Sequence, residues 1–98
     1  LCVKPNSVSI NEYLAGQCIT PHIDSKNSGE IITVLSLLSE ATMVFTHGNL
    51  KHSIVLPPRS IVQMKNEIRT VWKHAIEPVT ALYLEMVLLN NIFSAIYN

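Results

Sequence analysis

The sequence predicts an all-β fold of the barrel or sandwich type, with a jelly roll as the expected arrangement. Short strand-like segments separated by turn residues at close intervals are typical of that class. Residues 31–38 form an apolar run rich in β-branched side chains, which suits a strand covered on both faces. Hydrophobic residues make up 48% of the 98 residues and charged ones 14%, so the chain should fold as one domain around one core.

The first expected strand covers residues 7–13, where apolar and polar side chains alternate. Val8 and Ile10 fall on one face of this strand. The opposite face carries Ser9, Asn11 and Tyr13. Pro21 disfavours helix in the segment that bears His22, and a loop follows at residues 26–29.

The centre of the chain consists of further short strands. Beyond the central run at residues 31–38, we expect strands at residues 42–46, 51–56, 60–64 and 71–76. Turns at residues 48–49, 57–58 and 65–67 separate them. The last of these strands places Trp72, His74 and Ile76 on one face.

The end of the chain, residues 79–97, is apolar. Its apolar residues fit a helical stripe, so we expect a helix, and a strand through residues 81–88 is the alternative. Glu85, Asn90 and Asn91 interrupt the run, which makes it a poor membrane span. We therefore expect no membrane association.

Charge and cysteine content narrow the class of protein. The formal net charge is zero, from seven basic and seven acidic side chains, so there is no basic face of the kind that a free-standing nucleic-acid binder carries. Cys2 and Cys18 are too few for a disulfide framework and form no CxxC pair, which favours a reducing compartment, cytoplasm or nucleus. Because the chain starts at Leu1 without a signal-like segment, we expect it to be a piece of a longer protein.

His22, Asp24 and His74 form a candidate metal site. Two imidazoles and one carboxylate are the ligand set of non-haem Fe(II) oxygenases, and they leave about three coordination positions open. His22 and Asp24 lie two residues apart, so on an extended segment both point to the same side. His74 must then fold back from a distant strand.

An ordered set of motifs between Val8 and Ile76 resembles the AlkB-like Fe(II)/2-oxoglutarate dioxygenases. The similarity is greatest to the branch that hydroxylates modified wobble uridines in tRNA and to its bacterial relatives. The motifs are Asn11-Glu12-Tyr13-Leu14, Pro21-His22-Ile23-Asp24, Leu35-Ser36-Leu37, Leu56-Pro57-x-Arg59-Ser60-Ile61 and Glu67-x-Arg69-x-x-Trp72-x-His74-x-Ile76.

The resemblance implies a double-stranded β-helix and assigns roles to particular residues. Residues 1–78 would be a partial dioxygenase domain, and residues 79–98 an apolar tail that replaces or disrupts its last core strand. The implied cofactors are Fe(II), bound by His22, Asp24 and His74, and 2-oxoglutarate, bound by Asn11 and Tyr13. Arg69 would lie beside the substrate opening and face nucleic acid; the alternative is a surface charge balanced by Glu67.

The implied activity is oxidative hydroxylation or demethylation of a nucleic-acid base, in tRNA or in alkylated DNA or RNA. One departure bears on it: the family's Arg-x-Ser/Asn-x-Thr-x-Arg strand, whose first arginine pairs with the remote carboxylate of 2-oxoglutarate, has no counterpart. The chain has no arginine after Arg69 and no lysine after Lys73. Two alternatives therefore stay open, a truncated or degenerate metal-binding pseudoenzyme without turnover and a cupin-like metal-binding domain with an unrelated substrate.

Overall fold

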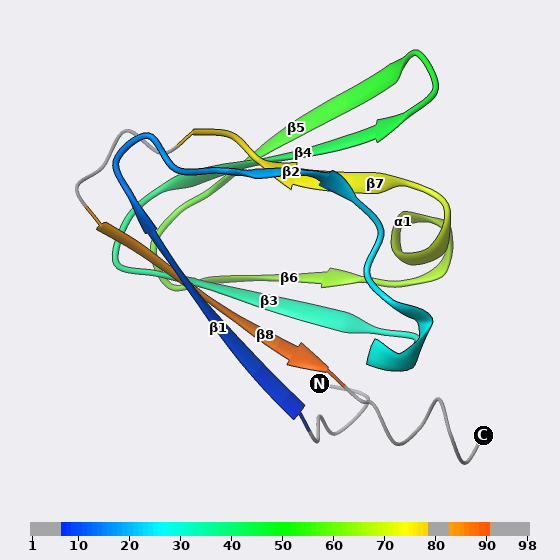
Figure 1. Cartoon of the computed structure of the whole chain (residues 1–98), viewed down its shortest axis with the longest axis horizontal. Coiled ribbons are helices and arrows are strands. Elements are labelled where there is room, and N and C mark those ends of the chain that lie inside the picture. Colours follow the sequence, from blue (N-terminus) through cyan, green and yellow to red (C-terminus); the bar gives the residue numbers. More distant parts are fainter. Residues whose placement is uncertain (1–6, 79–82, 91–98) are drawn as a thin grey trace.

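In the described part of the chain, two antiparallel sheets of four strands each face one another (Figure 1). The computed structural model describes residues 7–78 and the backbone of residues 83–90. One sheet, here the major sheet, has the strand order β1-β8-β3-β6, and the minor sheet has the order β2-β7-β4-β5. This arrangement confirms the predicted all-β, jelly-roll class.

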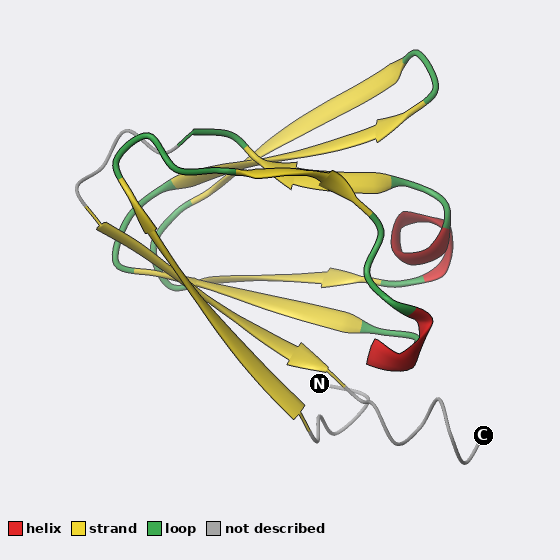
Figure 2. Cartoon of the chain, in the orientation of Figure 1, coloured by secondary structure: helices red, strands yellow, loops and turns green. Residues whose placement is uncertain are grey.

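Strands account for most of the described chain, with one 3-10 turn and one short α-helix (Figure 2). The strands are β1 (Ser7–Leu14), β2 (Ile19–His22), β3 (Ile32–Leu37), β4 (Ala41–His47), β5 (Leu50–Leu56), β6 (Ser60–Met64), β7 (Lys73–Ile76) and β8 (Tyr83–Asn90). The 3-10 turn η1 covers Lys26–Ser28, and the helix α1 covers Asn66–Thr70. None of the helices in this part of the chain could span a membrane.

The helix α1 replaces a turn that the sequence predicts at residues 65–67 and shortens the strand expected at 71–76. Asn66 begins it with a left-handed backbone (φ 57°), a conformation that asparagine tolerates better than most residues. The helix contains Arg69 and leads directly into β7, which carries His74.

The hydrophobic core lies between the sheets and follows from the alternation of apolar residues along each strand. Ile32 and Met64 of the major sheet are fully buried, and they pack in one cluster with Met43 and Phe45 of the minor sheet. Burial of each such side chain stabilises the fold by about 1.5–3 kcal/mol. The β4–β5 hairpin extends beyond this core (Figure 1), and its strand β5 is exposed up to Leu56.

Strand β8 corrects the prediction for the apolar tail. Residues 83–90 form a strand, so the expected helix is wrong there and the strand alternative is confirmed; residues 79–82 and 91–98 lie outside the described residues. β8 pairs with β1 along its whole length, from Ser7↔Asn90 to Leu14↔Tyr83, and with β3 on its other side. A mostly apolar segment, interrupted by Glu85 and Asn90, suits such a central strand. The described part of β1 has no other strand partner, so β8 is what attaches β1 to the sheet.

Candidate metal centre and adjoining cavity

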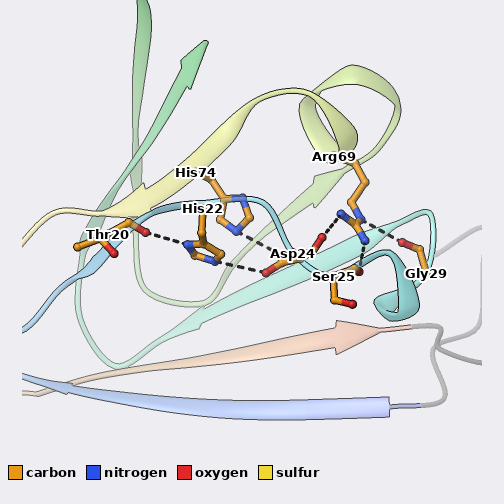
Figure 3. Close-up of polar contacts among 7 residues, drawn as sticks. All are labelled: Thr20, His22, Asp24, Ser25, Gly29, Arg69 and His74. Carbon is orange, nitrogen blue, oxygen red and sulfur yellow. Dashed lines mark hydrogen bonds and ion pairs between the residues drawn. The ribbon is translucent and has the colours of Figure 1, made fainter. Parts of the chain in front are cut away.

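His22, Asp24 and His74 come together where β2 pairs with β7 (Figure 3). The register places His22 directly opposite His74, and their ring centroids lie 4.3 Å apart. Asp24 follows the end of β2 and returns its carboxylate to the two imidazoles. One ligand atom from each of the three residues lies within 4.8 Å of the others. The structure therefore brings together the residues that the sequence predicted as a metal site.

The distances within this triad fit a shared metal ion. Nε2 of His22 lies 3.3 Å from Oδ1 of Asp24, and Nε2 of His74 lies 3.3 Å from Oδ2. Ligand atoms about 2.1 Å from one ion and at right angles to each other lie about 3.0 Å apart. The Asp24 carboxylate is therefore close to the separation from each imidazole that facial coordination requires.

The tautomer of His22 follows from its backbone contact. Nδ1 of His22 lies 2.8 Å from the carbonyl oxygen of Thr20. Because a carbonyl only accepts, Nδ1 carries a proton, and Nε2 is the ring nitrogen that faces Asp24 and can coordinate a metal. The buried Oδ2 of Asp24 makes no hydrogen bond with any described residue. A ring nitrogen placed to coordinate and a carboxylate oxygen without a hydrogen bond fit a cation, and this donor set suits Fe(II).

The carboxylate of Asp24 is ionised at neutral pH. The side-chain interaction with His74 holds the pKa of Asp24 below its ordinary value, and this outweighs the burial that would raise it. Positive charge on His74, His22 and Arg69 lowers the pKa further. A carboxylate kept charged in this way can bind a metal without first losing a proton.

A cavity of about 260 Å³ opens beside the triad, between the two sheets. Its described walls include the three candidate ligands, the polar face of β1 and apolar side chains of the core. They are Ser9, Asn11, Tyr13, Ile19, His22, Asp24, Ser28, Val34, Met43, His74 and Ile76. The volume is slightly below the roughly 300–1,000 Å³ of drug-sized pockets, so it suits a small polar acid.

Asn11 and Tyr13 both reach this cavity from β1, as the alternation of the strand predicted. Tyr13 is only 4% exposed. Burial, with a smaller contribution from Cys18, raises the pKa of Tyr13 to about 12. Its phenol therefore stays protonated at neutral pH and can donate a hydrogen bond to a carboxylate.

Lysine and arginine side chains are absent from the described walls of the cavity. The positions of β8 that pair with Ser9, Asn11 and Tyr13 are Leu88, Met86 and Leu84, all of them apolar. Strand β8 thus continues the sheet beside β1, but the residues of β8 that pair with Ser9, Asn11 and Tyr13 carry no charge.

Arg69 is buried beside the loop that carries Asp24. It is only 4% exposed, so the alternative prediction of a surface charge balanced by Glu67 is wrong. Its guanidinium donates three hydrogen bonds to main-chain carbonyls of the Asp24 loop: Nε to Gly29 at 3.0 Å, and its two terminal nitrogens to Asp24 at 3.0 Å and Ser25 at 2.7 Å (Figure 3). A role in nucleic-acid contact stays a prediction, and the geometry shows a side chain that fastens the metal loop to α1.

Other residues at the site had no signal in the sequence. Thr20 orients His22 through its main-chain carbonyl, which any residue type could supply. Ser28 lines the cavity because η1 folds back towards β1. Cys18, near the start of β2, is exposed.

Comparison of the sequence with known proteins identifies a family. The profile of the 2OG-Fe(II) oxygenase superfamily matches residues 2–86. The uncharacterized protein L905 of Acanthamoeba polyphaga mimivirus is 38% identical over 79 residues, which are 76% of this chain and 38% of that protein. The Xenopus tropicalis protein named tRNA (carboxymethyluridine(34)-5-O)-methyltransferase alkbh8 is 41% identical over 76 residues, 76% of this chain and 12% of its own. The chain thus spans a minor part of these relatives.

Two further similarities concern a plant relative and the fold. The Arabidopsis thaliana RNA demethylase ALKBH9B is 34% identical over 88 residues, 80% of this chain and 17% of that protein. The crystal structure of the Drosophila melanogaster CENP-C cumin domain superposes with a TM-score of 0.65 at 7% identity, covering 84% of this chain and 56% of the other, which shows a shared fold alone. With the family profile, the AlkB-type relatives and the two-His, one-Asp centre in agreement, the chain belongs to the 2OG-Fe(II) oxygenase superfamily as an AlkB-like member.

Proposed function

We propose that this domain uses Fe(II) and 2-oxoglutarate to hydroxylate or demethylate a nucleic-acid base. The proposal rests on the observation that two groups of residues line the same cavity. These are the His22, Asp24 and His74 triad and the Asn11 and Tyr13 pair. A metal-bound cosubstrate needs both groups within reach of one small molecule.

The residues divide the work by their chemistry. His22, Asp24 and His74 would hold Fe(II) on one side and leave its other side facing the cavity. When bound, iron with 2-oxoglutarate supplies the oxidising power that places oxygen from dioxygen into a substrate C–H bond. Tyr13 donates a hydrogen bond to the cosubstrate, and the amide of Asn11 provides a second polar contact. Apolar walls such as Val34 and Ile76 limit the water around these contacts.

The nucleic-acid substrate is inferred from the named relatives. One carries a tRNA modification in its name and another is called an RNA demethylase. A base in tRNA, or an alkylated base in RNA or DNA, is accordingly the proposed substrate, and a cytoplasmic or nuclear location accompanies it. If the oxidised carbon is an N-methyl group, the product releases formaldehyde; otherwise the alcohol is retained.

A second candidate function is metal binding without turnover. It is favoured by the described cavity walls, which offer no lysine or arginine to the remote carboxylate of 2-oxoglutarate. An uncharged set of donors binds a carboxylate more weakly than a bidentate arginine does. In that case β8 (Tyr83–Asn90) takes the place of the last core strand but lacks the arginine that would pair with 2-oxoglutarate.

Stepwise anaerobic addition of Fe(II) and then 2-oxoglutarate tests both candidates. We expect a visible iron-to-cosubstrate charge-transfer band, weakened in Tyr13→Phe and abolished in His22→Ala. His52→Ala, which removes an exposed histidine outside the triad, is the matched control and should leave the band intact. Metal binding with no band at any 2-oxoglutarate concentration would reject the enzyme and favour the second candidate.

A further inference from the structure

Three aromatic rings gather outside the cavity, where the β4–β5 hairpin meets the start of β7. The ring of Trp72 lies 5.5 Å from that of His47 and 5.8 Å from that of His52, centroid to centroid, with tilts of 38° and 45°. Both histidines are exposed, whereas Trp72 is half-buried and packs against the core. The indole is thus a fixed support for two solvent-facing imidazoles. These three residues are called the ring cluster below.

The strand register relates this ring cluster to the metal centre. Phe45 of β4 pairs with His52 of β5 on one side and with His74 of β7 on the other, so these residues form one row across the minor sheet. Directly paired residues share a face, and His74 points into the cavity. Trp72 lies two residues before His74, in the bend that leads into β7. The ring cluster therefore lies on the cavity face of the minor sheet, next to the strand that carries His74.

The charge around the ring cluster favours an anionic partner. The hairpin from Ala41 to Leu56 contains no acidic residue. Lys51 and Lys73 both pair with Thr46, on the reverse face, and both are exposed. The ring cluster and the two lysines thus lie on opposite faces of the same strands, on a hairpin that carries no carboxylate. Aromatic rings and lysines are the side chains with which proteins bind single-stranded nucleic acid, the rings by stacking on bases and the lysines by pairing with phosphates.

We infer that the ring cluster is a stacking site for the unpaired base next to the one that enters the cavity. Because Trp72 lies only two residues before His74, a base stacked on the rings would belong to a nucleotide adjacent to the one at the candidate metal site. Stacking on imidazole does not depend on base identity, so this site selects for unpaired structure in the substrate and not for its sequence. The inference rests on the proposed function, because it assumes a nucleic-acid substrate in the cavity.

Trp72 provides its own reporter, since it is the chain's single tryptophan. The Fe(II)-loaded protein is titrated with a ten-nucleotide oligouridylate and with an abasic oligomer of equal length and charge. We expect saturable quenching of tryptophan fluorescence by the oligouridylate and weaker binding of the abasic oligomer. His52→Ala should weaken oligouridylate binding by about tenfold, since base stacking on one ring is of that order. Ser53→Ala, on the same strand but the reverse face, is the control and should bind as the wild type does.

Equal binding by wild type, His52→Ala and Ser53→Ala would overturn the inference, as would equal affinity for the abasic and uridine oligomers. The iron-to-2-oxoglutarate charge-transfer band, measured on the same samples without nucleic acid, separates the two proposals. A band with no quenching refutes the stacking site alone. Quenching that His52→Ala weakens, without a band, supports the stacking site and refutes the oxygenase.

Discussion

Replacing Arg69 with methionine should loosen the metal loop more than it unfolds the protein. The substitution keeps much of the aliphatic stem but removes the donors to the carbonyls of Gly29, Asp24 and Ser25. A hydrogen bond from a charged group contributes about 1.5–3 kcal/mol, so three such bonds set an upper limit of roughly 5–9 kcal/mol. Two effects reduce this value.

The first is rehydration, because Ser25 is exposed and water can replace the lost donor there. The second is that Arg69 is buried with no ion pair to any described carboxylate, so removing its charge recovers desolvation energy. We therefore expect a loss of about 2–4 kcal/mol in the free energy of unfolding, or roughly 10–20 °C in Tm for a domain of this size. Urea unfolding followed by circular dichroism measures it.

Metal affinity should fall as well, since Arg69 bonds to the main chain of Asp24 itself and α1 leads into the strand of His74. Loss of such an outer-sphere partner lowers metal affinity by about 10–100-fold. Calorimetric titration with Co(II), well below the Tm of the variant, measures this separately from stability. Lys65→Met removes an equal charge from an exposed position and is the control. Wild-type Co(II) affinity in Arg69→Met, or an equal loss in Lys65→Met, would refute the reasoning.

Three other predictions follow from the site and the sheet. Asp24→Asn should lower Fe(II) affinity at least tenfold. In the metal-free protein the pKa of Asp24 is depressed on folding, so the contribution of its carboxylate to stability is present above the unfolded pKa of about 3.8 and is lost as the pH falls through the folded value. The urea midpoints of wild type and variant should therefore converge in acid, and a constant gap between them would contradict this. The pKa of Tyr13 is raised, so its contribution is complete below pH 10 and declines as the pH approaches 12; absorbance at 295 nm should show a late tyrosinate step that Tyr13→Phe removes, and an unchanged titration would count against its burial. Val87→Pro interrupts β8 between β1 and β3, so it should destabilise the fold by about 3 kcal/mol or more and abolish 2-oxoglutarate binding, whereas normal binding would show that β1 is held in another way.

Local patterns in the sequence were sufficient to predict most of the strands. The alternation in residues 7–13 predicted that Asn11 and Tyr13 share a face, and both line the cavity. The two-residue spacing of His22 and Asp24 likewise predicted that both could reach one ion. Each of these inferences depends only on the period of a strand, which the chain carries within a few residues.

The secondary structure of the apolar tail could not be predicted from such local patterns. Residues 83–90 are apolar apart from Glu85 and Asn90, and a mostly apolar run of this kind is shared by buried helices and central strands. Pairing with β1 and β3 selects the strand, because both of its edges then satisfy their backbone hydrogen bonds. Those partners lie far away in the sequence, and no local propensity encodes them.

By itself, then, the sequence determined the strand class and the identity of the candidate metal ligands, because side-chain type and short-range period are written in it. Tertiary structure decided how those ligands are held. Arg69 binds carbonyls of residues 40 to 45 positions away, and Thr20 orients His22 through its own carbonyl. Every residue carries a carbonyl, so such contacts leave no signature in the residue types and exist only once the chain has folded.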